Sequence, residues 1–147
     1  MNCLSFDVGG TTVKYGVIDE SYKILKKDKI PTPENENDFI YSLSNIIQEN
    51  LSIISKVSVA MPGYVNSANN KYLYGPHLKY DIDFSKLSNF TDYKFHLDND
   101  GNVAAYCEYF LNYKTKYSNL IMLTFGTGIG GGIISELSLI HISEPTR

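Results

Sequence analysis

Residues 5–18 (SFDVGGTTVKYGVI) leave few folds open, because an apolar strand, a Gly-Gly turn and a second apolar strand follow one another without a break. The pattern predicts a β-hairpin whose turn holds Gly9 and Gly10, followed by the hydroxyls of Thr11 and Thr12. Glycines can adopt positive φ and let backbone N–H groups approach an anion closely. Two interpretations are open here: an ordinary hairpin with a Gly-Gly turn, or a hairpin that binds phosphate.

The same pattern returns at residues 120–134 (LIMLTFGTGIGGGII), with a turn that contains Gly126, Thr127 and Gly128. A second copy predicts an internally duplicated fold, in which two similar lobes each offer one turn to a nucleotide between them. The glycines also satisfy G-x-G-x-x-G, but β-branched residues follow them instead of a helix. No G-x-x-x-x-G-K-[ST] is present, so a dinucleotide fingerprint and a P-loop are both excluded.

Composition narrows the class of protein further. With 147 residues, of which 43% are hydrophobic, the chain can bury one modest core. A net charge of -3 gives no basic surface for nucleic acid or an anionic membrane. No apolar run is long enough to span a membrane and no signal peptide is recognisable, so we expect a cytoplasmic protein. Cys3 and Cys107 have no metal-site or redox spacing, and we expect two buried thiols.

The order of elements predicts an α/β fold. Three strands at 2–8, 12–19 and 22–30 form an antiparallel meander, and a further strand at 56–61 stops at Pro62-Gly63. A long loop over 64–92 contains one weak helical piece at 84–90, and a strand at 93–97 follows it. Two amphipathic helices are expected on these apolar stripes: Phe39, Leu43, Ile46, Ile47 and Leu51; and Val103, Cys107, Phe110 and Leu111.

Residues 98–102 (DNDGN) gather carboxylates and amides where open α/β sheets place their ligands, beyond the carboxyl end of a strand. One such residue is explained as a helix N-cap, but a cap does not explain four. A bound alcohol could give its proton to Asp100 as it attacks a phosphorus atom. Asn99 offers an acceptor and donors to neighbouring hydroxyls.

Four motifs in order resemble the N-terminal lobe of the ROK family, the sugar kinases and sugar-responsive repressors within the actin-like ATPase superfamily. They are residues 7–11 (DVGGT), 58–63 (SVAMPG), 99–105 (NDGNVAA) and 126–132 (GTGIGGG). The resemblance implies an actin-like, ribonuclease H-like lobe with a mixed sheet, an N-terminal antiparallel meander and flanking helices. It also implies ATP-dependent phosphorylation of a hexose or amino-hexose, in the manner of a glucokinase.

The resemblance assigns roles to particular residues. Asp100 would be the general base, Asn99 and Gly63 would contact the sugar, and Asp7 would hold Mg²⁺. The residues implied around the ATP phosphates and Mg²⁺ are Asp7, Gly9, Gly10, Thr11, Thr12, Lys14, Gly126, Thr127 and Gly128. An alternative interpretation of Lys14 is a solvated lysine on a strand.

The sequence also departs from the family. Where members often read Pro-Asn-Leu in the substrate loop, this chain has Pro76-His77-Leu78, and His77 is either a different sugar ligand or an exposed loop histidine. The family's downstream Glu-x-x-His sugar motif and Cys/His zinc motif are absent. We therefore expect residues 1–118 to form the N-terminal lobe and residues 119–136 to be the first strands of a second lobe.

Residues 137–147 resemble the translation of a transposase-type sequencing adaptor, so we expect the native sequence to end near Glu136. Such a truncated chain would lack kinase activity, and the strand at 130–135 would have an unpaired edge. The parent protein is expected to bind sugar and ATP, and a homodimer is its candidate oligomeric state. Two other functions stay open: a sugar-sensing transcriptional regulator of the same family, for which no helix-turn-helix precedes Asp7, and an actin-like structural or chaperone ATPase.

Overall fold

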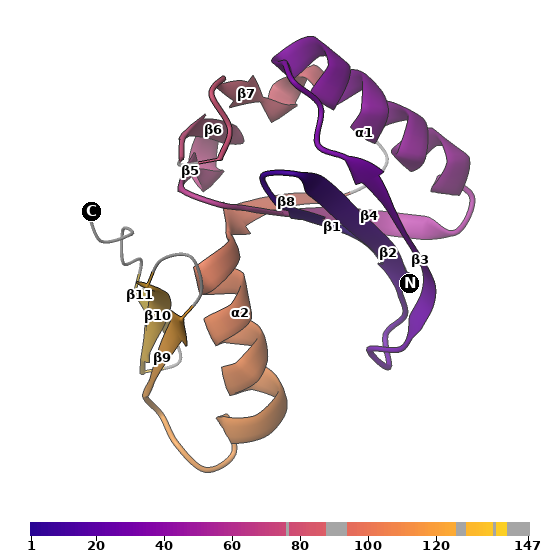
Figure 1. The fold of residues 1–147 in the computed structure, drawn as a ribbon. Coiled ribbons are helices and arrows are strands. Elements are labelled where there is room, and N and C mark those ends of the chain that lie inside the picture. The colour runs from indigo at the N-terminus through magenta and orange to yellow at the C-terminus, as the bar shows by residue number, and fades with distance from the viewer. Residues whose placement is uncertain (76, 88–93, 126–128, 137, 141–147) are drawn as a thin grey trace. The chain divides into compact units, whose positions relative to one another are not determined.

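The computed structural model describes residues 1–75, 77–87, 94–125, 129–136 and 138–140 (Figure 1). The chain divides into two units, Met1–Asp98 and Asn99–Arg147. The predicted boundary at residue 118 stays a prediction.

A five-stranded mixed sheet with the order β3-β2-β1-β4-β8 forms the centre of the first unit (Figure 1). Its strands are β1 (Asn2–Val8), β2 (Thr12–Ile18), β3 (Ile24–Pro31), β4 (Ile54–Met61) and β8 (Lys94–Asn99). β1 pairs antiparallel with β2, β2 antiparallel with β3, and β1 parallel with β4. The expected meander and the strand that follows the first helix are therefore present.

Helix α1 (Glu36–Asn50) covers one face of this sheet (Figure 1). Asn35 starts the helix, because its side-chain oxygen accepts a hydrogen bond from the Asp38 backbone N–H at 3.0 Å. The helix buries Phe39, Leu43, Ile46 and Ile47 of the predicted stripe. Each such side chain contributes about 1.5–3 kcal/mol on burial, so packing against the sheet holds this helix in place.

Residues 64–87 differ from the expected long loop, because they form a second sheet of three short strands. These are β5 (Tyr64–Asn66), β6 (Lys71–Tyr74) and β7 (Ile82–Asp83), with 3-10 helices at Ser67–Asn69 and Phe84–Leu87. Tyr72, Ile82 and Phe84 join the core of the first unit. Of the predicted helical piece at 84–90, the first four residues form the second 3-10 helix, and residues 88–90 lie outside the described residues.

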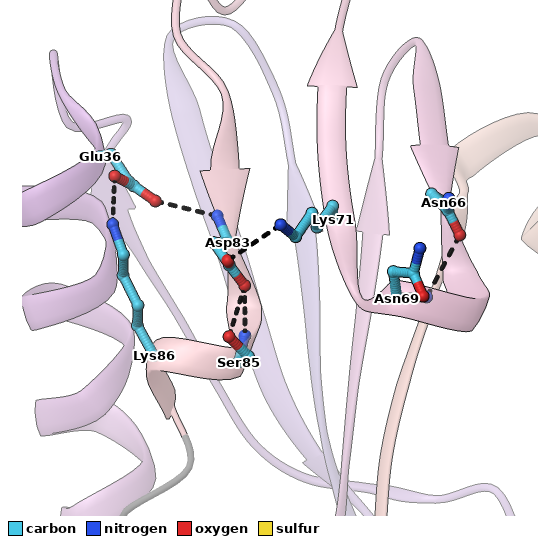
Figure 2. A network of polar contacts seen from close by, with 7 residues as sticks. All are labelled: Glu36, Asn66, Asn69, Lys71, Asp83, Ser85 and Lys86. Carbon is cyan, nitrogen blue, oxygen red and sulfur yellow. Dashed lines mark hydrogen bonds and ion pairs between the residues drawn. The ribbon is translucent and has the colours of Figure 1, made fainter.

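A network of polar contacts connects this second sheet to α1 (Figure 2). Glu36 in the first turn of the helix accepts a hydrogen bond from the Asp83 backbone N–H at 2.9 Å and pairs with Lys86. Asp83 in turn accepts from the Ser85 hydroxyl at 2.6 Å and lies 3.3 Å from the Lys71 ammonium. The bond from Lys86 lowers the pKa of Glu36, and the bond from Ser85 lowers the pKa of Asp83.

The second unit contains helix α2 (Asp100–Glu108), a π-helical turn (Tyr109–Tyr113) and a sheet of β9 (Leu120–Phe125), β10 (Ile129–Ser135) and β11 (Ser138–Ile140). The sheet order is β11-β10-β9, and both pairings are antiparallel. The expectation of an unpaired edge at 130–135 is wrong, because β10 has a partner on each side.

The buried face of α2 also differs from the predicted stripe. Asn102, Ala105 and Tyr109 are buried, whereas Cys107 is exposed. The reason is that α2 packs closely on the glycines of β10, where small side chains fit better than large ones. The expectation of two buried thiols is therefore wrong for Cys107, and Cys3 is half-buried.

Candidate functional site

The turn between β1 and β2 is held by bonds at both ends. The Gly9 N–H donates to the Thr12 carbonyl at 2.9 Å and closes the turn. Thr32, directly after β3, donates its hydroxyl to the Gly9 carbonyl at 2.7 Å and its N–H to the Thr11 carbonyl at 3.1 Å. Thr32 was not identified from the sequence. The available signal was its place between Pro31 and Pro33: proline has no backbone N–H, so Thr32 carries the only one among these three residues.

The glycines of this turn differ in backbone conformation from what the sequence suggested. Among the described residues, Gly63 is the glycine with positive φ, so the positive φ expected at Gly9 and Gly10 is not adopted. The Gly9 N–H is used inside the hairpin. At Gly10 a Cβ atom would lie 2.9 Å from His77 Cβ and 3.1 Å from His77 Cγ, so glycine leaves room there for the histidine.

Asp7 and Lys14 lie opposite each other on β1 and β2, next to the turn. The Lys14 ammonium is 3.5 Å from an Asp7 carboxylate oxygen, and the two side chains are 70% and 61% exposed. An exposed pair of this kind contributes little to stability, so neither side chain is held there by the pairing. Both side chains remain exposed at the surface beside the turn.

Mg²⁺ fits Asp7 only in part. Mg²⁺ is commonly held by one or two carboxylates, with waters and substrate phosphates completing its shell. Within the described ranges, no cluster of three or more His, Cys, Asp or Glu side chains offers a complete protein cage. Asp7 would therefore supply one oxygen ligand, and a nucleotide and water would supply the rest.

Gly63, the predicted sugar contact, lies in a tight contact between two hairpin ends. Its φ is 88°, and a Cβ atom would lie 2.5 Å from the Tyr74 carbonyl oxygen and 2.6 Å from Gly75 Cα. Gly75 is equally restricted, since its own Cβ would meet the Pro62 carbonyl oxygen at 2.8 Å. Sequence reasoning missed Gly75, whose position directly before Pro76 was the available signal.

Asn99 and Asp100 lie at the beginning of α2. The Asn99 side-chain oxygen accepts from the N–H groups of Gly101 at 2.9 Å and Asn102 at 3.2 Å, so Asn99 is the N-cap. Asp100 is the first helical residue, and its Oδ1 accepts from the Gly101 N–H at 2.8 Å. An acidic side chain in the first turn interacts favourably with the positive end of the helix dipole. Of the other polar residues in this cluster, Asp98 and Asn102 are buried.

The first turns of α2 pack on β10 through glycine. A Cβ at Gly101 would lie 3.4 Å from the Gly131 carbonyl oxygen, and a Cβ at Gly132 would lie 2.6 Å from Ala105 Cβ. Gly101 of the helix and Gly132 of the predicted second phosphate motif therefore allow a close approach of helix and strand. Gly126, Thr127 and Gly128 lie outside the described residues. The helix that begins with Asp100 thus lies beside the strand that follows them.

The first unit brings several predicted site residues to one turn. By the pairings and contacts above, the residues that lie in this turn or beside it are Asp7, Gly9, Gly10, Thr11, Thr12, Lys14 and His77. His77 lies against the phosphate-type turn, which the sequence did not suggest. Gly63 lies against Gly75, two residues before His77. Asn99 and Asp100 belong to the second unit.

The fold is that of the actin-like ATPase-fold sugar kinases, as predicted. One solved structure, a ROK family glucokinase from Streptomyces griseus in complex with glucose and AMPPNP, superimposes with a TM-score of 0.80 at 26% identity. The likeness covers 95% of this chain and 46% of that one. The ROK family model matches residues 3–142, and the chain belongs to the ROK family.

Curated relatives are sugar kinases. The chain is 30% identical over 136 residues to a glucokinase of Streptomyces coelicolor, covering 89% of this chain and 43% of the relative. It is 32% identical over 151 aligned residues to an N-acetylmannosamine kinase of Pasteurella multocida, covering 99% of this chain and 50% of the relative. The chain therefore spans about half the length of the curated relatives it matches. In the part of the chain that the structure describes, no helix has the length and apolarity needed to cross a membrane.

Proposed function

We propose that this chain supplies the N-terminal half of an ATP-dependent kinase that phosphorylates a hydroxyl of a hexose or amino-hexose. Family membership and the two kinases above support this reaction class. The S. griseus neighbour binds glucose and AMPPNP, which supports a sugar and ATP as the ligands here. The protein is proposed to work in the cytoplasm and to bind no nucleic acid.

One observation carries the proposal. Asp100 opens α2, and the first turns of this helix pack on β10, the strand directly after residues 126–128. A carboxylate at a helix N-terminus therefore lies in the same unit as the predicted second phosphate turn. This is the combination that phosphoryl transfer to an alcohol requires, because the attacking hydroxyl must lose its proton close to the phosphate.

The proposed reaction assigns each group one task. The sugar hydroxyl oxygen forms a bond to the γ-phosphorus of ATP, the bond from that phosphorus to the β-γ bridging oxygen breaks, and ADP leaves. Asp100 takes the hydroxyl proton. Asn99 and Gly63 are proposed to contact the sugar. Asp7 would hold Mg²⁺, which neutralises phosphate charge when bound.

The turns supply positioning and charge stabilisation, which is most of catalysis in this class of reaction. The proposed nucleotide contacts are those of the first turn, including Lys14, and of Gly126, Thr127 and Gly128. We further propose that residues 119–136 begin the second lobe and that residues 137–147 are not native. The chain by itself is then expected to have negligible kinase activity.

The test is a sugar panel with the protein translated from the resequenced, complete reading frame. ADP release is measured with glucose, fructose, N-acetylglucosamine and N-acetylmannosamine, with a no-sugar control, and sugar phosphates are identified by mass spectrometry. We expect ADP release that depends on one of these sugars and matches the sugar phosphate formed. ATP hydrolysis that is independent of sugar would instead indicate an actin-like ATPase. Specific DNA binding without ATP turnover would indicate a transcriptional regulator.

A further inference from the structure

We propose that His77 is a phosphate-binding residue of the first turn, where its imidazole donates a hydrogen bond to an oxygen of the nucleotide's phosphate chain. This inference rests on the proposed function and adds a ligand to its nucleotide site. It replaces the expectation that His77 contacts the sugar.

The geometry of the turn carries the inference. A Cβ atom on Gly10 would lie 2.9, 3.1 and 3.4 Å from His77 Cβ, Cγ and Nδ1, so the imidazole lies directly on the turn. His77 reaches it from the segment after β6, far away in sequence. Any larger residue at position 10 would displace the ring. Gly10 and His77 therefore form one structural feature.

The surroundings suit an anion. Gly10, Thr11 and His77 are all exposed, so a phosphate group can reach the turn and the ring together. The Lys14 ammonium lies on the adjoining strand next to the turn; its 3.5 Å pairing with the Asp7 carboxylate is exposed and weak, so the ammonium can turn toward a phosphate. A neutral imidazole donates one N–H and a protonated imidazole donates two, so His77 can bind a phosphate oxygen in either state.

Described residues on both sides of His77 are anchored. Gly75, two residues earlier, packs on Gly63, and Leu78, the next residue, is buried in the core. Tyr80 donates a hydrogen bond from its hydroxyl to the Pro33 carbonyl. Anchors on both sides of His77 limit the freedom of its backbone, and a positioned donor loses less entropy when it binds a ligand.

The experiment uses the protein from the complete reading frame, labelled for NMR and titrated with ATP and Mg²⁺. We expect the His77 ring protons and the amides of Gly10 and Thr11 to shift together, with one dissociation constant. His77→Ala is expected to weaken ATP binding about tenfold, the effect of losing one hydrogen bond to a charged group. His77→Asn, which keeps a shorter donor, should lie between the two. His96→Ala is the matched control, because His96 is an exposed histidine of the same unit, and it should bind ATP like the wild type.

Several outcomes separate this inference from the proposed function. If ATP shifts the Gly10 and Thr11 amides but His77→Ala binds it with unchanged affinity, the role of His77 is refuted and the nucleotide site stands. If glucose shifts the His77 ring and ATP does not, His77 is a sugar ligand and the inference is wrong. If ATP shifts neither the turn nor the ring, both the inference and the proposed nucleotide site are wrong. Should His77→Ala fail to fold, His77→Asn still tests the role, with a smaller loss of ATP affinity expected.

Discussion

Gly63→Ala is expected to destabilise the first unit strongly. Gly63 has φ of 88°, and an L-residue in the left-handed region costs about 1–2 kcal/mol. The added Cβ would also lie 2.5 Å from the Tyr74 carbonyl oxygen and 2.6 Å from Gly75 Cα. Both contacts are with backbone that cannot rotate away, and overpacking of this kind costs about 1–3 kcal/mol. The sum, about 2–5 kcal/mol, is a large share of the 5–15 kcal/mol of a typical domain.

Urea denaturation followed by far-UV circular dichroism measures this change, because the chain has no tryptophan for fluorescence. Hydrogen exchange in peptides from 61–75 assigns the loss to the β5–β6 region. Asn70→Gly is the matched control, because Asn70 also has a positive φ, of 52°, and its hydrogen bonds to Ser67 and Phe84 are made by the backbone. We expect its free energy of unfolding to change by about 0.5 kcal/mol or less. A Gly63→Ala midpoint equal to that of the control would refute the argument.

Three further variants test other contacts. Glu36→Gln should lower the free energy of unfolding by about 1 kcal/mol at neutral pH. Because Lys86 lowers the pKa of Glu36, this contribution is lost as the pH falls through the pKa of Glu36 in the folded protein. The urea midpoints of variant and wild type should therefore converge in acid, and a constant difference would contradict the pairing. Burial raises the pKa of Tyr80 to about 12, so the contribution of its neutral hydroxyl to folding stability is complete below the normal tyrosine pKa and is lost as the pH rises toward about 12. In an ultraviolet titration this late ionisation should disappear in Tyr80→Phe. If it persists in the variant, it belongs to another tyrosine. A Cβ atom on Gly132 would lie 2.6 Å from Ala105 Cβ, so Gly132→Ala should speed hydrogen exchange in α2, and adding Ala105→Gly should restore protection. Failure of this rescue would contradict the packing of α2 on β10.

Local patterns predicted the meander and α1 well. The Gly-Gly turn between two apolar strands and the cap at Asn35 act over a few residues, so their outcome can be read from adjacent positions. The β5–β7 sheet was missed because its strands are only two to four residues long, too short for a period of two to be visible. Tyr72 and Ile82 could have indicated it, since both are large apolar residues in a polar stretch and both are buried.

The site was harder to predict because its contacts are long-range. The sequence marked Gly10 as a glycine of a phosphate turn, but the reason it must be small is His77, which reaches it from a distant segment. Gly132 was included in the second phosphate motif, but its small size allows α2 to approach β10. Asn99 and Asp100 were identified by their residue types, and the structure adds that they form the cap and first residue of α2.

The role of Asp100 is tested most directly by the turnover number of Asp100→Asn in the protein from the complete reading frame. Loss of a general base lowers kcat by about 10²- to 10⁴-fold, and we predict this loss with little change in KM for the sugar. Asp81→Asn, at an exposed carboxylate of the first unit, should retain the wild-type rate. A wild-type kcat in Asp100→Asn would contradict the proposed mechanism.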